Sequence, residues 1–494
     1  MTTTSEALVD VSKAIEHTLL LIGGEWVDAL DGGVFDTVNP STGEVLAQVA
    51  EAGAADVDRA VKAAREAFDH GPWPRMKPAE RTAALWRLGD LILADAQEMG
   101  RVETLDQGKP YSSAVHGDVP SAAGLFHYMS GFATKLEGST IPISAPGDFH
   151  TYTRREALGV VGLIVPWNFP LVISSWKVAP ALAAGNTVVL KPAESTPLSA
   201  LRLGQLALDA GIPPGVLNVV NGFGATAGQR LAEHPDVDKI SFTGSTATGR
   251  RILDAARGNL KRVTLELGGK SANIIFPDAD LQTAIQGSSD GIFYNAGQAC
   301  AAGSRLYVHD DVYDEVVAGI AEKARAIKVG DGFDPASEIG PLASREHFDR
   351  VSKYLDIGRS EGTVVTGGGR LGDRGYFVEP TVFTDAASDA RILKEEIFGP
   401  VVVATRFREI DEVVAAANDT RYALAAGIWT GSISTAHTVA ARISAGTVWV
   451  NAYGVFDPSM PFGGMKESGW GREMGHAVMH DYTDIKTVCV KLGG

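Results

Sequence analysis

One cysteine in the sequence stands in a setting that suits a nucleophile. Cys300 lies in FYNAGQACAAGSR, residues 293–305, between alanines and just after Gly297 and Gln298. A lone free cysteine is most often structural, because free cysteine is among the most buried residue types. Small neighbours, however, leave an attacking group the access that a core cysteine does not need. We therefore interpret Cys300 as a candidate nucleophile.

A nucleophilic thiol needs a base, and the sequence offers two kinds. The nearest histidine, His309 in VHDDVYDE, precedes Asp310 and Asp311, which are typical of the start of a surface helix, so we discount it. A papain-like C-G-S-C-W context is also missing. Glu266 in LELGGK ends a predicted strand and is followed by two glycines that leave its side chain room. A solvated carboxylate is the simpler interpretation of Glu266 alone, and a general base is the alternative.

The segment PWNFP, residues 166–170, holds an amide between two prolines. Proline fixes the backbone, so Asn168 is braced at the end of a buried strand. A rigidly held amide is what an oxyanion hole requires, whereas an asparagine in an ordinary turn rarely needs such bracing.

Three segments suit the binding of a nucleotide, although each alone is a weak signal. NGFGATAG (residues 221–228) is one residue longer than the glycine fingerprint of dinucleotide sites, and GSTATG (residues 244–249) lacks its middle glycine. Each follows an apolar run and precedes a helical pattern, where backbone N–H groups can receive a phosphate, although an ordinary turn explains each equally well. KPAE places Lys191 and Glu194 at the end of a strand, where an acidic residue can bind ribose hydroxyls.

The elements that must position these groups form two systems. From residue 157 to 266, β-branched runs such as VVGLIV, NTVVL and RVTLEL alternate with helical patterns, which predicts a parallel sheet with helices on both faces. After residue 270, apolar residues recur at helical spacing over 313–320 and 410–417, which predicts a second α/β system. The break falls at LELGGKS, residues 265–271. Ligands often bind beyond the carboxyl ends of such strands and between domains.

The remaining segments are less regular. Helical patterns cover residues 54–68 and 79–98. The polar stretch from 139 to 157 has too little apolar character to form a core, so we expect it to pair with another chain or domain.

Composition narrows the class of protein. A net charge of −16 and a pI near 5.2 disfavour nucleic acid and anionic membranes as partners, because both repel such a surface. Cys300 and Cys489 give neither a disulfide framework nor a metal-ligand spacing, which suits a reducing compartment. The N-terminus has acidic residues before any apolar run, so we expect no targeting signal and a cytoplasmic location. The apolar window 157–173 is broken by two prolines and an asparagine, which disfavours a membrane span.

Taken together, the motifs resemble those of the aldehyde dehydrogenase superfamily. PWNFP, KPAE, FTGST, ELGGK, FYNAGQAC, EEIFGP and PFGGMKESGWGRE occur in the order of that family, and the resemblance runs from IGGEWV at 22–27 to YTDIKTV at 482–488. The chain is most similar to the hydrolytic, NAD-dependent, tetrameric branch.

The resemblance implies a role for each matching residue. Cys300 matches the nucleophile, Asn168 with the Cys300 backbone N–H the oxyanion hole, and Glu266 the base that activates water. Lys177 and Glu473 resemble the pair that carries protons away. The positions that match cofactor contacts are Ile164, Pro166, Trp167, Lys191, Glu194, Gly224, Gly228, Phe242, Gly244, Ser245, Leu267, Glu396 and Phe398. The positions that match the substrate tunnel are Phe169, Val172, Ile173, Trp176, Tyr294, Phe456 and Phe462.

The resemblance also implies an architecture. We expect two open parallel-sheet α/β domains, a Rossmann-like NAD-binding domain over 1–136 and 157–266 and a catalytic domain over 267–477, with a β oligomerisation arm over 137–156 and 478–494. NAD is the expected cofactor, with NADP less favoured, and no metal is expected. The expected partners are a small aldehyde and further copies of the chain in a homotetramer.

Three alternatives stay open at this level. A CoA-acylating semialdehyde dehydrogenase would pass the thioester to a thiol, and Glu266 speaks against it. Aromatic tunnel walls could hold a choline-like cation, so betaine aldehyde competes with medium-sized apolar or aromatic aldehydes. A structural protein that kept the fold without turnover is disfavoured by the intact set of candidate catalytic residues.

Overall fold

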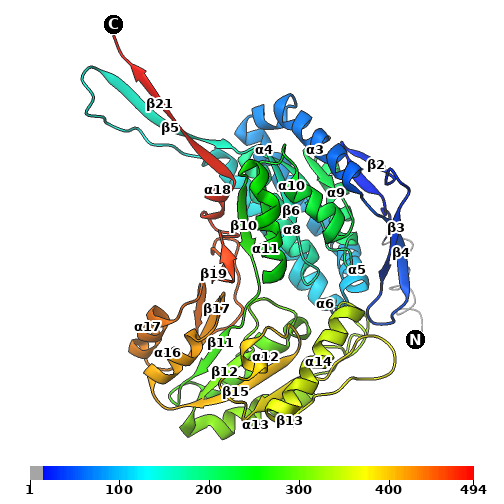
Figure 1. The fold of residues 1–494 in the computed structure, drawn as a ribbon, viewed down its shortest axis with the longest axis vertical. Helices are drawn as coiled ribbons and strands as arrows, with labels where there is room; N and C mark the ends of the chain where they lie inside the picture. Colours follow the sequence, from blue (N-terminus) through cyan, green and yellow to red (C-terminus); the bar gives the residue numbers. More distant parts are fainter. Residues whose placement is uncertain (1–14, 494) are drawn as a thin grey trace.

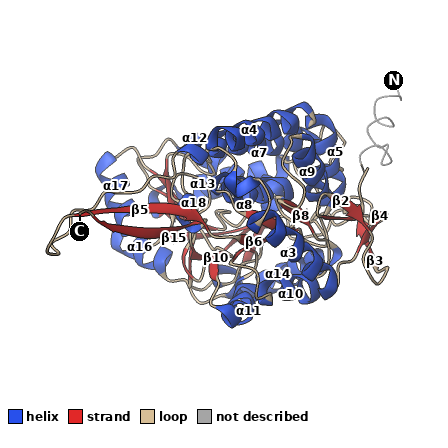
Figure 2. Cartoon of the chain, turned by 90° about the horizontal axis from the view of Figure 1, so that it is seen from above, coloured by secondary structure: helices blue, strands red, loops and turns tan. Residues whose placement is uncertain are grey.

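Two sheets with helices packed around them form the body of the protein in the computed structural model, which describes residues 15–493 (Figures 1 and 2). The first sheet has the order β2 (Glu25–Val27), β1 (Leu20–Ile22), β8 (Leu217–Val219), β7 (Thr187–Lys191), β6 (Val160–Ile164), β9 (Lys239–Thr243), β10 (Arg262–Glu266) and β20 (Gly469–Trp470). The five strands from β8 to β10 are parallel, and β1, β2 and β20 are antiparallel additions. The predicted alternation of strands and helices is therefore confirmed.

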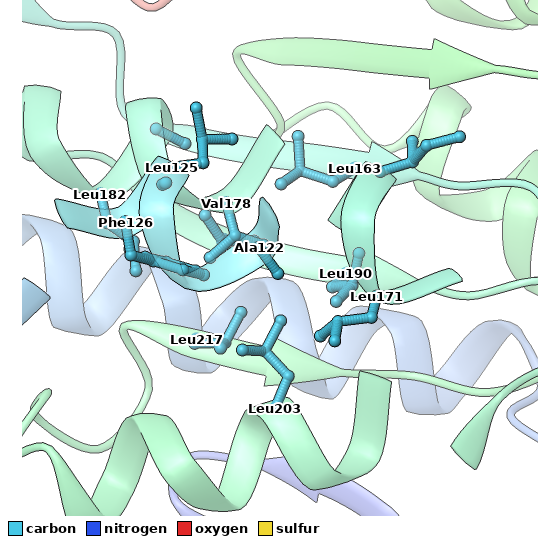
Figure 3. Packing of buried hydrophobic residues seen from close by; sticks show 14 of the residues in the cluster. Ala122, Leu125, Phe126, Leu163, Leu171, Val178, Leu182, Leu190, Leu203 and Leu217 are labelled. Carbon is cyan, nitrogen blue, oxygen red and sulfur yellow. The ribbon is translucent and has the colours of Figure 1, made fainter. Parts of the chain in front are cut away.

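The helices that accompany this sheet come from residues 54–256. They are α3 (Ala54–Asp69), α4 (Pro78–Ala94), α5 (Ala96–Gln107), α6 (Tyr111–Ser113), α7 (Val119–Ser130), α8 (Pro170–Ala184), α9 (Leu198–Asp209), α10 (Gln229–Glu233) and α11 (Thr246–Ala256). Every residue of β6 and β7 is buried, as expected for parallel strands covered on both faces. Figure 3 shows one such layer, in which leucines of the strands pack against Phe126 of α7 and Val178 of α8.

The second sheet is also mostly parallel. Its order is β13 (Thr363–Thr366), β14 (Thr381–Thr384), β15 (Val401–Phe407), β12 (Arg305–His309), β11 (Ala272–Ile275), β17 (Ala425–Trp429) and β18 (Thr447–Val450), with only β13 antiparallel to its neighbour. Its helices are α12 (Leu281–Phe293), α13 (Tyr313–Ala326), α14 (Arg345–Glu361), α15 (Arg391–Lys394), α16 (Ile410–Asn418) and α17 (Ile433–Arg442). The chain passes from one sheet to the other through LGGKS, the segment singled out in the sequence.

An antiparallel ribbon projects from the body (Figure 1). It pairs β5 (Phe149–Ala157) with β21 (Thr483–Lys491) over nine residue pairs. The short helix α18 (Val478–Asp481) immediately precedes β21. The polar stretch at 139–157 was expected to pair with another chain or domain, and within this chain its partner is the C-terminal strand β21. Two smaller ribbons join β3 (Val34–Val38) to β4 (Val45–Ala50) and β16 (Tyr422–Ala423) to β19 (Met465–Lys466).

The prediction of a continuous helical pattern over residues 79–98 is wrong in one respect. It is interrupted at Asp95, which ends α4 and begins α5. The Asp95 carboxylate is held by the guanidinium of Arg202 on α9, so a tertiary ion pair lies at the junction of the two helices. Across residues 15–493, none of the helices is both long and apolar enough to cross a membrane.

Candidate active site

The register of the first sheet brings the candidate residues together at one edge. Ile164 of β6 lies opposite Lys191 of β7 and opposite Phe242 of β9, and Glu266 of β10 lies opposite Thr243. Ile164, Lys191 and Glu266 end their strands, and Phe242 lies one residue before the end of β9. The segments PWNFP and KPAE therefore leave the sheet at the same edge.

A cavity of about 610 Å³, counting its open mouth, lies at this edge. It is lined by Pro166, Trp167, Asn168, Ile173, Thr243, Gly244, Ser245, Leu267, Gly268, Cys300, His347, Arg350, Glu396 and Phe398. The structure thus gathers the candidate nucleophile, the candidate oxyanion donor and much of the candidate cofactor set around one space. Thr243, Gly268, His347 and Arg350 were not among the candidates.

Two hydrogen bonds hold Asn168, one at its backbone carbonyl and one at its side-chain amide. Its backbone carbonyl accepts a hydrogen bond from Asn295 Nδ2 at 2.9 Å, and its own Nδ2 donates to the backbone carbonyl of Gln298 at 2.9 Å. One amide hydrogen is thereby fixed, and the second is left for an acceptor in the cavity. The bracing that the two prolines predicted is present, although much of it comes from the nucleophile's own loop.

The loop that carries Cys300 has an unusual backbone. Asn295, Ala296 and Gly297 follow one another at φ of 50°, 53° and 72°. A Cβ at Gly297 would lie 2.1 Å from the carbonyl oxygen of Gly399, so only glycine fits there. Cys300 is partly buried, and burial together with the carboxylates of Glu266 and Glu396 raises the pKa of its thiol to about 12. The resting thiol is therefore neutral and must lose its proton as it attacks.

Glu266 is a buried carboxyl group, so the interpretation of a solvated strand end is wrong. Its side chain is packed against Gly463, where a Cβ would lie 2.6 Å from Oε1. Neither carboxylate oxygen has a hydrogen-bond partner within residues 15–493. Burial, and then the charge of Glu473, raise the pKa of Glu266 well above its usual value. A carboxylate destabilised in this way is suited to take a proton near neutral pH.

Lys177 and Glu473 form a buried ion pair. The Lys177 ammonium also donates to the Ser241 hydroxyl at 2.8 Å, and Ser241 donates to Glu473 Oε1 at 3.4 Å. Burial raises the pKa of Glu473 against the opposing effect of Lys177. The ion pair that the resemblance implied is therefore present, and the charges of both its members act on the pKa of Glu266.

The other end of the cavity suits a dinucleotide. Ser245 caps α11, an eleven-residue helix whose N-terminus faces the cavity, and a Cβ at Gly244 would lie 2.5 Å from the Phe242 ring. The backbone can therefore come close to a phosphate at the positive end of a helix. Glu396 accepts a hydrogen bond from the backbone N–H of Gly269 at 2.8 Å, which leaves Oε2 for a ribose hydroxyl.

Lys191 and Glu194 lie together beyond β7. Lys191 is buried, with its Nζ 2.7 Å from the carbonyl of Pro192 and 3.5 Å from the Glu194 carboxylate, which is half-exposed. A Cβ at Gly228 would lie 3.6 Å from the Lys191 stem, so the turn Gly224–Gly228 runs beside it. The candidates for the adenosine half are therefore also brought together, and the residues present fit a dinucleotide.

Comparison with known proteins gives the family. The model of the aldehyde dehydrogenase family matches residues 26–488. The chain belongs to this family. It is 51% identical to aldehyde dehydrogenase family 2 member B4, mitochondrial, of Arabidopsis thaliana, over 99% of this chain and 91% of that protein. It is therefore an oxidoreductase that oxidises aldehydes to acids.

Solved structures agree with this assignment and with NAD as the cofactor. The NAD+ complex of an aldehyde dehydrogenase from Bacillus cereus is 48% identical, with a TM-score of 0.95 over 100% of this chain and 99% of that one. An indole-3-acetaldehyde dehydrogenase from P. syringae, in complex with NAD+ and IAA, is 42% identical, with a TM-score of 0.95 over 97% and 98%. NAD use is thus confirmed for this family member.

Helix α14 supplies two lining residues that sequence reasoning missed. His347 Nε2 lies 2.7 Å from the carbonyl oxygen of Phe398, and its ring lies 4.7 Å from that of Trp167. Burial lowers the pKa of His347 to about 4, so the ring is neutral and donates this hydrogen bond. Arg350 donates to the backbone carbonyl of Glu396 at 2.8 Å. The segment REHFDR reads as an ordinary helix start, so no signal marked these residues.

A buried ionic cluster behind Asn168 was also missed. The Lys109 ammonium is paired with Asp118 and lies 3.4 Å from Glu103 and 4.6 Å from the centre of the Phe169 ring. Glu103 in turn accepts the backbone N–H of Leu171 at 3.1 Å. These residues come from α5 and the segment after it, where nothing in the sequence connects them to PWNFP.

The aromatic tunnel candidates form two groups. The rings of Trp176, Phe456 and Phe462 lie 5.3–6.0 Å apart, and Phe169 stacks on Tyr294 at 6.0 Å. Val172 and Ile173 are buried on α8, and Ile173 lines the cavity beside Cys300. The missed Trp449 packs on Phe456 at 5.6 Å, and the missed Tyr453 donates to the carbonyl of Ala301 at 2.7 Å. Of the tunnel candidates, Ile173 lines the cavity, and Phe169 and Trp176 pack with Cys300 against one apolar cluster that contains Phe462.

Proposed function

We propose that the chain oxidises aldehydes through a covalent bond to Cys300 and releases the acid by hydrolysis. We base this on one observation: Cys300 and the braced amide of Asn168 line a cavity that fits a dinucleotide, and the buried carboxyl of Glu266 is near enough for its charge to act on the thiol. The sulfur would add to the aldehyde carbon, and its proton would pass to a water molecule in the cavity as the bond forms. The carbonyl oxygen would become negative and accept hydrogen bonds from Asn168 Nδ2 and the Cys300 backbone N–H.

The cofactor residues would orient NAD+ along the edge of the first sheet. When bound, NAD+ supplies an acceptor for the hydride of the thiohemiacetal. Glu396 and Phe398 would hold its nicotinamide end, Ser245 the pyrophosphate, and Lys191 with Glu194 the adenosine ribose. The remaining candidates would form the apolar walls: Ile164, Pro166, Trp167, Phe242 and Leu267 are hydrophobic or rigid, and Gly224, Gly228 and Gly244 permit a close approach.

Hydrolysis would then depend on Glu266. Its carboxylate would take a proton from water while the oxygen adds to the thioester carbon. The Cys300 sulfur would then leave and regain its proton from the carboxylic acid, which departs as the carboxylate. Glu473, held by the Lys177 ammonium, would accept the proton from Glu266 before the next turnover. The product is a carboxylic acid, and no second thiol is needed.

The hydrolytic route predicts turnover without coenzyme A. With aldehyde and NAD+ alone, we expect one carboxylic acid per NADH, measured by chromatography and by absorbance in the same sample. Added CoA should change neither the rate nor the product. Acyl-CoA as the main product, or a rate that depends on CoA, would assign the chain to the acylating branch.

The oxyanion role of Asn168 predicts a loss in kcat. Asn168→Ala should lower kcat by about 10²- to 10³-fold, because a preorganised donor acts mainly in the transition state. Asn451→Ala is a matched control, since the side-chain amide of Asn451 also makes hydrogen bonds to backbone groups, here the N–H and carbonyl of Thr430, and Asn451 does not line the cavity. Steady-state kinetics of the folded variants would give kcat and KM separately. A change confined to KM would make Asn168 a binding residue and not an oxyanion donor.

NAD should be preferred to NADP. The carboxylate of Glu194 lies beside the proposed adenosine ribose site, where it would repel a 2′-phosphate.

The tunnel predicts a medium-sized apolar or aromatic substrate. Its proposed walls carry no arginine, and the nearby Lys109 is already paired with Asp118, so a second carboxylate on the substrate would stay unpaired. A Cβ at Gly454 would meet no atom within 4 Å, which leaves width beside the aromatic rings. The P. syringae relative is named for an aromatic aldehyde, which also favours this class.

An aldehyde panel tests this choice. We expect kcat/KM for phenylacetaldehyde and hexanal to exceed that for acetaldehyde by a factor that corresponds to about 1 to 3 kcal/mol. Betaine aldehyde is the second candidate, because aromatic walls can hold a quaternary ammonium. A higher kcat/KM for succinic semialdehyde or betaine aldehyde would refute the apolar assignment.

The β5–β21 arm would mediate assembly in a homotetramer. It carries exposed apolar side chains such as Ile485 and Val490 on a ribbon outside the body, where a second copy would cover them. We place the enzyme in the cytoplasm, because its two cysteines are free.

A further inference from the structure

A second buried lysine lies on the same face of the first sheet as Glu266. Residues two apart along a strand share a face, and the parallel pair β9–β10 places polar residues opposite one another. We call these six residues the polar stripe: Lys239, Ser241 and Thr243 of β9 lie opposite Arg262, Thr264 and Glu266 of β10. The residues between them on β9, Ile240 and Phe242, belong to the apolar core on the other face.

The middle of the polar stripe touches the Lys177–Glu473 pair. Lys177 donates to the Ser241 hydroxyl at 2.8 Å, and Ser241 donates to Glu473 at 3.4 Å. Thr264 is the cross-strand partner of Ser241, about 5 Å away by the spacing of paired strands, a gap that one water molecule spans. The polar stripe is therefore continuous with the proposed acceptor of the Glu266 proton.

Lys239 is fully buried, and among residues 15–493 it forms no salt bridge with a carboxylate. Its ammonium donates to the Thr264 hydroxyl at 2.9 Å and lies 5.0 Å from the centre of the Tyr482 ring. The charged groups that face it are Asp481 of α18, Glu473 after β20, Lys177 of α8 and Arg262 of β10. Burial dominates these charges and lowers the pKa of Lys239 to about 7, so its amine can both take and release a proton near neutral pH.

The route continues from Lys239 to the surface. Gly471 lies over Thr264, and a Cβ there would be 2.6 Å from Thr264 Cγ2 and 3.2 Å from Asp481 Oδ2, so Asp481 lies just beyond Thr264. Asp481 is only partly buried and is oriented by the backbone N–H of Arg472 at 3.0 Å. It ends α18, which lies at the root of the β5–β21 arm in Figure 1.

We propose that Lys239 extends the proton exit beyond the Lys177–Glu473 pair and delivers protons to Asp481 at the surface. This rests on the proposed function, in which each hydrolysis leaves one proton on Glu266. That proton would pass to Glu473, along the hydroxyls of Ser241 and Thr264 to the Lys239 amine, and then to Asp481 and water. Each group returns to its starting state, and no oxidant or reductant is required. Lys239 touches neither substrate nor cofactor, so it is a relay and positioning residue.

Two substitutions separate proton transfer from structure. Lys239→Met removes the amine, whereas Lys239→Arg keeps the positive charge but cannot release a proton, because arginine stays protonated in proteins. Lys261→Met is a matched control: Lys261 also has a pKa lowered by burial, to about 8, but it donates to the carbonyls of Ala232 and His234 outside the polar stripe.

Rapid mixing with aldehyde and NAD+ resolves the first turnover from later ones. For both Lys239 variants we expect an intact NADH burst and a steady rate about 10-fold lower, less than the 10²- to 10⁴-fold effect of a direct acid–base group. Methylamine should restore part of the steady rate in Lys239→Met, and Lys261→Met should behave as wild type.

Three outcomes would overturn the relay. The first is a wild-type steady rate in both Lys239 variants, and the second is full activity in Lys239→Arg, which would make charge sufficient. The third is a burst and a steady rate that fall by the same factor together with a lower melting temperature, which would make the role structural. If Lys239→Met does not fold, Lys239→Arg decides in the same assay. Loss of the burst in Glu266→Gln would instead overturn the proposed function itself.

Discussion

Cys300→Ala should abolish NADH formation with every aldehyde. We expect a loss of about 10⁴-fold or more in kcat, because a nucleophile that forms the covalent intermediate cannot be replaced by binding and oxyanion stabilisation alone. The side chain is only partly buried, so its truncation should leave the fold and the dinucleotide site intact. Steady-state absorbance gives the rate, and quenching of protein fluorescence by NADH gives cofactor binding.

The chain supplies its own control for this experiment. Cys489 is exposed on β21, and its thiol accepts a hydrogen bond from Thr151 at 3.4 Å within the arm. Cys489→Ala removes the same atom from the other cysteine and should leave turnover unchanged. Steady turnover in Cys300→Ala at the wild-type rate would show that no bond to this sulfur is needed.

The raised pKa of Cys300 adds a second expectation to the same variants. A neutral thiol reacts slowly with alkylating agents, since the thiolate is the nucleophile. Iodoacetamide at neutral pH should therefore label the exposed Cys489 before Cys300 in the free enzyme. Mass spectrometry of the two single-alanine variants distinguishes the sites.

Much of the fold could be predicted because buried parallel strands have a simple pattern. VVGLIV and NTVVL are continuous apolar runs between helical patterns, and they became β6 and β7. The break at LELGGKS was visible because two glycines follow a strand. The split of the helix at Asp95 could not be predicted, because the ion pair found there joins Asp95 to Arg202, more than a hundred positions away.

The candidate site shows the same division between local and tertiary information. Cys300, Glu266 and Asn168 carry local signals: small neighbours, a strand end before glycines, and flanking prolines. His347 and Lys109 reach the site only through packing of α14 and of the segment after α5, so no short pattern marks them. The polar stripe lies between these cases, since KISFT and RVTLE alternate visibly between polar and apolar residues, but only the register places Lys239 beside the Lys177–Glu473 pair.

Glu266→Gln should separate the two halves of the reaction. Hydride transfer precedes hydrolysis, so the variant should form one NADH per active site in a burst and then nearly stop, with a steady rate lower by about 10²- to 10⁴-fold. The burst itself should not slow, because the charge of Glu266 helps to raise the pKa of Cys300, and its removal makes the thiol easier to ionise. The double variant with Cys300→Ala should show no burst, which ties the first NADH to the sulfur.

The pH dependence of hydrolysis provides the second test of Glu266. The base must be ionised, so the rate of hydrolysis in the wild type should rise as pH increases through the elevated pKa of Glu266 and level off above it. The Gln variant has no such group, so its residual steady rate should rise continuously with the hydroxide concentration and should not level off. Steady rates measured over a pH series in wild type and variant would show the difference. A burst followed by turnover at the wild-type rate, or an unchanged pH profile in Glu266→Gln, would mean that another group activates the water.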